Sequence, residues 1–232
     1  IVITRRTNEK FGQRFDDIII DAAKKYNRNI DAVSTGFANA GVDLGSGEVT
    51  KLQIPKIAVL SGEQTSSLSF GEIWHFFERQ IDYPITTIRT DYFNRIDLDG
   101  YHVLLVPNGY YRLFNENTLS KVESWVRDGG KLILIGNALR SFEGQSGFAL
   151  KYFTEAENKK NKKEDGDTLK RVESYERDGL SSSIFGAIFK VSMDNSNPLA
   201  YGYGIEYYSL KTSNLRFAYL KGGQNVGVLK GD

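Results

Sequence analysis

Three short apolar runs, at residues 57–60, 103–106 and 132–135, divide the central part of the chain. Residues 85–88 resemble a further strand, and two longer segments with helical periodicity lie between these strands. Continuous apolar runs are typical of strands that are covered on both faces of a parallel sheet. The alternation with helices therefore predicts a three-layer α/β sandwich with a central, mainly parallel sheet of flavodoxin-like type.

The two helical segments between these strands carry recognisable ends. The first covers residues 70–81, and we expect Ser69 and Glu72 to form a capping box at its start. The second follows Asn115, which we interpret as its N-cap, and ends at Gly129-Gly130.

Residues 1–52 have a pattern of their own and predict a strand-helix-strand extension. Apolar positions recur at helical spacing over 15–26, the short apolar run at 1–3 predicts one strand, and residues 30–34 are expected to form the other. Because the apolar face of the helix needs a partner, we expect this extension to pack against the main domain, residues 53–232.

The composition changes near residue 151. Residues 151–180 are rich in both charge signs and poor in aliphatic side chains, which indicates a solvated excursion of the main domain. Beyond it, we expect strands near residues 184–191, 215–220 and 226–229. An aromatic, glycine-punctuated loop is predicted at 201–208.

Charge and residue counts exclude several classes of function. Lys and Arg number 30 against 29 Asp and Glu, so no global field attracts nucleic acid. No run of about 18 apolar residues is present, so we expect no direct membrane insertion. The chain has no cysteine and two histidines, His75 and His102, without clustered ligand spacing, so we expect no metal and no cofactor. We place His75 on a helix surface and His102 at the amino end of its strand.

Ligands of open parallel sheets bind at the carboxyl ends of the strands. This rule selects three loops, at residues 62–67, 108–111 and 136–138. A site of this protein is therefore expected there.

The order of elements from residue 56 to about 140 resembles the class I glutamine amidotransferase-like domains, with VPNG (106–109) at one strand end and GGKLILIGNA (129–138) at the next. A narrower similarity is to the amidotransferase-like domain that follows the catalytic domain in large bacterial zinc carboxypeptidase-like proteins. It lies in PKIAVLSGE (55–63), GEIWHFFE (71–78) and NPLAYGYG (197–204). The resemblance implies a periplasmic or secreted piece of a longer protein, with a signal outside the piece and the other domains as partners.

Carried over residue by residue, the resemblance implies a non-catalytic domain with a binding or structural role. The nucleophile position falls on Asn137, with Gly136 and Ala138 as neighbours, and none of these side chains forms a thioester. No histidine follows His102, so we expect no glutaminase activity. If the geometry of the superfamily is retained, five residues converge on one site, which either holds a small polar ligand or ordered water or is filled by Tyr110 or Tyr203. The five residues are Glu63, Asn108, Gly109, Tyr110 and Asn137. Gly109 matters because a side chain there would obstruct backbone donors.

Two alternatives stay open. One is a hydrolase that uses Glu63 with Ser66 or Asn108. The other is a carbohydrate- or peptide-binding module that uses exposed aromatic faces. Its candidate residues are Tyr110, Tyr111, Tyr201, Tyr203, Tyr207 and Tyr208.

Overall fold

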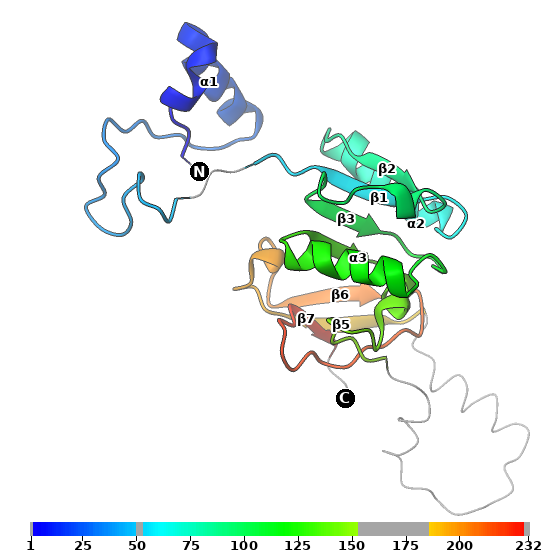
Figure 1. The fold of residues 1–232 in the computed structure, drawn as a ribbon. Helices are drawn as coiled ribbons and strands as arrows, with labels where there is room; N and C mark the ends of the chain where they lie inside the picture. The colour runs from blue at the N-terminus through cyan, green and yellow to red at the C-terminus, as the bar shows by residue number, and fades with distance from the viewer. Residues whose placement is uncertain (1, 50–52, 153–185, 230–232) are drawn as a thin grey trace, which may run out of the picture. The chain divides into compact units, whose positions relative to one another are not determined.

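The computed structural model describes residues 2–49, 53–152 and 186–229 (Figure 1). The chain forms two compact units, Ile1–Ile54 and Pro55–Asp232. From residue 153 onward, the charged excursion expected at 151–180 lies outside the described residues. Within the described part, no helix has the length and hydropathy that crossing a bilayer requires.

The first unit contains the predicted helix but not its flanking strands. A 3₁₀ segment, η1 (Arg6–Arg14), leads into α1 (Phe15–Lys25), which has acidic residues in its first turn and lysines in its last. This arrangement complements the helix dipole. The strands expected at 1–3 and 30–34 are wrong, because residues 2–3 and 30–34 are irregular and pair with no other described strand. The packing of this extension against the main domain stays a prediction.

The second unit is built on a four-stranded parallel sheet. Its strands are β1 (Ile57–Ser61), β2 (Thr86–Arg89), β3 (Val103–Val106) and β4 (Lys131–Leu134). They lie in the order β2-β1-β3-β4, and all three pairings are parallel. Figure 1 shows β2, β1 and β3 side by side. The prediction of a mixed α/β domain with a parallel sheet is therefore confirmed.

The core lies between one face of this sheet and α3 (Glu116–Arg127). Leu119, Val122 and Trp125 of α3 belong to the same buried cluster as Leu60 and Leu104. Successive side chains of a strand point to opposite faces. The neighbouring Val59 is fully buried as well, and α2 contacts β1, so the central strand is covered on both sides.

One helix cap follows the prediction and the other does not. The Asn115 side chain accepts a hydrogen bond from the backbone N–H of Thr118 at 3.2 Å and caps α3 as expected. The helix α2 (Ser67–His75) is capped by Ser66, whose hydroxyl accepts from the backbone N–H of Ser69. The capping box at Ser69 is therefore wrong. A π-helical turn, η2 (Phe76–Gln80), continues α2.

A second, antiparallel sheet follows near the C-terminus. Its strands β5 (Ile188–Met193), β6 (Glu206–Leu210) and β7 (Gly227–Leu229) lie in the order β6-β5-β7 (Figure 1). Tyr207 and Tyr208 belong to β6, so the loop predicted at 201–208 is wrong in its second half.

The strand predicted at 215–220 is also wrong. Its backbone forms one isolated bridge, from Phe217 to Tyr152, and the N–H of Leu220 donates to the side chain of Asn225 instead of to a strand. Three short 3₁₀ segments complete the fold. They are η3 (Phe93–Arg95), η4 (Gly136–Phe142) and η5 (Pro198–Ala200).

Candidate functional site

The strand order reverses next to β1, and this reversal marks the candidate site. From β1 the chain moves to β2 on one side, and it then returns to β3 on the other side. In open α/β sheets, the loops that leave such a point diverge and leave a crevice at the carboxyl ends of the two strands. The loops that follow β1 and β3 lie at this edge, as the sequence rule predicts.

The two loops are joined through their backbones. Thr65 and Gly109 form an isolated antiparallel bridge. On either side of it, the N–H of Ser66 donates to the carbonyl of Asn108 at 2.8 Å, and the N–H of Tyr110 donates to the carbonyl of Gln64 at 3.0 Å. The two loops therefore form one wall with a defined conformation.

A cleft of about 590 Å³ opens along this wall. The first loop contributes residues 63–66, and the second contributes Asn108, Gly109, Tyr110 and Arg112. The volume falls within the range of about 300–1,000 Å³ that is common for small-molecule sites. Four of the five predicted binding residues thus line one cleft, and Asn137 is the exception.

Asn108 connects the cleft to the end of β4. Its side-chain oxygen accepts a hydrogen bond from the backbone N–H of Asn137 at 2.8 Å. The backbone N–H of Asn108 donates to the Ser69 hydroxyl at 3.0 Å. Gly136 has φ +60°, and a Cβ there would lie 2.6 Å from the same Asn108 oxygen. Asn137 therefore contacts a residue of the cleft through its backbone without lining the cleft itself, while Ala138 is buried.

The structure gives Gly109 a different role from the predicted one. A Cβ at this position would lie 2.2 Å from the backbone oxygen of Gln64 and 3.0 Å from the ring of Tyr111. The glycine therefore permits the two loops to approach each other. The role predicted from the sequence, keeping backbone donors open toward a ligand, stays a prediction.

Gln64, Thr65 and Tyr111 hold the second loop in place, a role that the sequence did not predict for them. The Gln64 side-chain oxygen accepts the backbone N–H groups of Arg112 at 2.5 Å and Leu113 at 3.0 Å. The Tyr111 hydroxyl donates to the carbonyl of Pro107 at 2.9 Å and lies 3.2 Å from the Thr65 hydroxyl. Burial raises the pKa of the Tyr111 phenol above its usual value. The rule that selects strand-end loops includes Gln64 and Thr65, whereas Arg112 lies one residue beyond the selected loop.

The charged groups at the cleft are exposed. Glu63 and Arg112 both face solvent. Nearby, Arg89 forms an ion pair with Asp91 at 3.0 Å, and its hydrogen bond holds the pKa of the Asp91 carboxyl below its usual value. Ser66, the candidate hydroxyl for a hydrolase that uses Glu63, accepts the capping bond of α2, and no histidine lines the cleft. This set of groups is suited to hydrogen bonding a ligand and lacks a paired nucleophile and base.

Both histidines lie away from the cleft. His102 Nδ1 accepts a hydrogen bond from the backbone N–H of Lys56 at 2.9 Å, at the amino ends of β1 and β3. It lines a different pocket of about 270 Å³, together with Asp99 and Asp128. His75 is exposed on α2. Across the described ranges 2–49, 53–152 and 186–229, no group of three His, Cys, Asp or Glu side chains could hold a metal ion.

The candidate tyrosines fall into three groups. Tyr110 lines the cleft with 75% of its surface exposed, and Tyr111 is buried beneath it. Tyr203 and Tyr207 contact each other edge to face with ring centroids 5.3 Å apart. Tyr201 is exposed at the end of η5, and Tyr208 is exposed within β6. The cleft is open, and Tyr110 is the candidate tyrosine that lines it.

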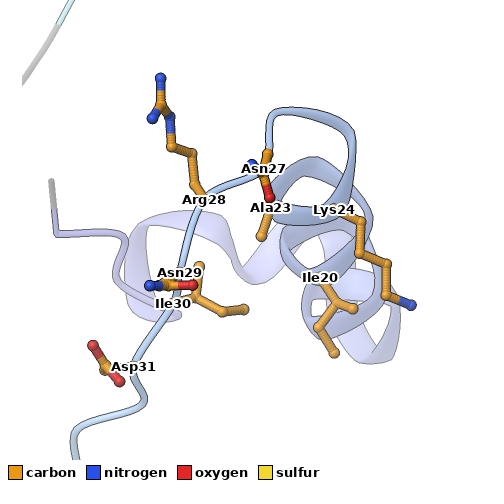
Figure 2. A pocket seen from close by; sticks show the side chains of 8 residues that line it. All are labelled: Ile20, Ala23, Lys24, Asn27, Arg28, Asn29, Ile30 and Asp31. Carbon is orange, nitrogen blue, oxygen red and sulfur yellow. The ribbon is translucent and has the colours of Figure 1, made fainter.

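A second hollow of similar volume lies in the first unit, where the chain turns back after α1 (Figure 2). Asn27 reverses the chain there with φ +49°, and the N–H of Arg28 donates to the carbonyl of Ala23. Figure 2 shows the Arg28 and Asp31 side chains pointing away from the helix and from each other. The polar groups of this hollow do not converge, so it is the weaker candidate.

Comparison with protein-family models, with curated proteins and with solved structures finds no match to this chain.

Proposed function

We propose that this chain is a non-catalytic, class I glutamine amidotransferase-like accessory domain of a larger secreted protein. In this proposal, the cleft between residues 63–66 and 108–112 binds a small polar ligand. The larger protein is of the zinc carboxypeptidase-like kind that the sequence motifs resemble. The domain contributes binding, and the chemistry belongs to another part of that protein.

The strand order supports the finer assignment of the fold. Doubly wound sheets of flavodoxin-like type have the order 2-1-3-4-5, and the described parallel strands follow the first four places of that order. The cleft then lies at the reversal next to β1, which is where this type of fold binds its ligands.

The bond between Asn108 and Asn137 carries the proposal. Asn137 occupies the position that resembles the nucleophile, and its backbone N–H donates to the Asn108 side chain at 2.8 Å. A backbone donor engaged in this way is not available to stabilise a developing oxyanion. The arrangement therefore supports a rigid binding edge more than a reaction centre.

Turnover and binding distinguish this proposal from the hydrolase alternative. We expect no product from a panel of esters, amides and glutamine. We also expect the amide NMR signals of Gln64 and Gly109 to shift on addition of small polar ligands. Turnover that is lost in Glu63→Gln, but retained in the matched surface variant Glu116→Gln, would overturn the proposal.

The context of the domain has its own test. An upstream metallocarboxypeptidase-like domain and a secretion signal in the full-length gene product would support the proposed accessory role in a secreted protein. A full-length product without either would refute the accessory role in a secreted carboxypeptidase-like protein, while the binding role of the cleft would remain open to the NMR test.

A further inference from the structure

The hydrogen bonds inside the wall determine which ends of the two amide side chains can meet a ligand. The side-chain oxygens of Gln64 and Asn108 both accept backbone N–H groups. A backbone N–H requires an acceptor, so the orientation of each amide follows from its partners. The NH₂ groups have no hydrogen-bond partner among the described residues, and they are the ends that remain for a ligand.

The cleft combines these donors with balanced charge. Glu63 supplies one carboxylate and Arg112 one guanidinium, so the charges of the two charged side chains that line the cleft sum to zero. The adjacent Arg89 and Asp91 neutralise each other in an ion pair. A site with no net charge and several fixed donors and acceptors favours an uncharged ligand with many hydrogen-bonding groups.

Tyr110 adds an apolar surface to this polar site. Tyr110 is 75% exposed at the cleft, although it lies in the chain between the buried residues Gly109 and Tyr111. Its backbone N–H donates to Gln64, so the position of the ring along the wall is defined by the loop pairing. An exposed aromatic face held by a rigid backbone provides contact area at low entropic cost.

We propose that the ligand of this cleft is a neutral saccharide. One C–H face of a sugar ring packs on Tyr110, and its hydroxyl groups accept from the NH₂ groups of Gln64 and Asn108 and donate to Glu63. Arg112 supplies further donors at the open side of the cleft. This inference rests on the proposed binding role and names the ligand class for the same site.

Saturation-transfer NMR and titration with neutral mono- and disaccharides test the inference. The panel contains glucose, galactose, mannose, N-acetylglucosamine, maltose and cellobiose. We expect at least one sugar to bind and to shift the amide signals of Gln64 and Gly109. Tyr110→Ala should then weaken binding about 2- to 10-fold, as loss of an aromatic contact does. Glu63→Gln should weaken binding as well, because a charged acceptor is replaced by a neutral one.

Tyr219→Ala is the matched control, because Tyr219 is 66% exposed and does not line the cleft. Binding that is insensitive to Tyr110→Ala and Glu63→Gln, or that is lost in Tyr219→Ala, would overturn the inference. If free amino acids or dipeptides shift the same amide signals and no sugar does, the saccharide assignment is wrong and the binding role stands. If no ligand of either class shifts them, both proposals fail.

Discussion

Asn108 and Asn137 join the ends of β3 and β4 through a hydrogen bond of 2.8 Å between a side-chain oxygen and a backbone N–H. Asn108→Ala removes the acceptor and leaves the half-buried N–H of Asn137 without a partner. We expect the free energy of unfolding to fall by about 1–3 kcal/mol. Urea denaturation followed by the fluorescence of the buried Trp125 measures the change. Asn108→Asp keeps an acceptor oxygen and should recover most of the loss; equal destabilisation by both substitutions would show that this bond contributes little.

Gly109→Ala should separate the two loops of the cleft. The added Cβ would lie 2.2 Å from the backbone oxygen of Gln64, so the backbone must move, and we expect a loss of about 1–3 kcal/mol in stability. Hydrogen exchange of the Ser66 and Tyr110 amides should become faster, because both bonds span the two loops. Gly71→Ala in α2 is the control, because nothing lies within 4 Å of the position that the added Cβ would take. Alanine in place of glycine in a helix should raise the free energy of unfolding by up to about 1 kcal/mol. Unchanged exchange in Gly109→Ala would contradict the assigned role.

Tyr111 should make the fold sensitive to alkali. Its pKa in the folded chain is raised above the ordinary 10.0, so above that pH the unfolded chain releases a proton that the folded chain retains. The contribution of Tyr111 to the free energy of unfolding is fully present below pH 10.0. It is lost as the pH rises toward the pKa that Tyr111 has in the folded chain. Tyr111→Phe should cost about 0.5–1.5 kcal/mol at neutral pH, through the lost bond to Pro107. The difference in stability between the two proteins should shrink above pH 10.0. A difference that stays constant with pH would refute the assignment.

The chain should release no ammonia from glutamine and should retain no zinc. The sequence contains no cysteine, and His75 and His102 lie away from the cleft. A coupled ammonia assay tests the first expectation, and elemental analysis after washing with a chelator tests the second. Ammonia release that depends on Asn137 or Glu63, or one retained metal ion per chain, would contradict these expectations.

The parallel sheet and α3 were predictable because their signals are local. Strands buried on both faces need continuous apolar runs, as at 57–60 and 103–106. The apolar run at 132–135 also contributes a parallel strand, but Ile133 is 45% exposed, so burial on both faces was wrong for β4. The Asn115 cap acts on a backbone N–H only three residues away. The position of the cleft followed from a general rule about the carboxyl ends of parallel strands.

Features that depend on distant contacts were not predictable in the same way. Ser66 and Ser69 both fit the N-cap position of α2. Which of them caps the helix depends on Asn108, 39 positions further along the chain, because its backbone N–H donates to the Ser69 hydroxyl. Gln64 reaches the backbone of Arg112, 48 positions away. Tyr207 and Tyr208 are both exposed, so β6 lacks the alternating burial that identifies a strand, and its pairing with β5 forms it.

The central place of β1 has a consequence for synthesis of the chain. β1 leaves the ribosome before either of the strands that pair with it, and β3 follows only after residue 103. At about 5–20 residues per second, its apolar run remains without a sheet partner on the order of seconds. Nascent chains that stall between residues 61 and 86 therefore expose an unpaired apolar strand, and they should bind chaperones that recognise short extended apolar peptides.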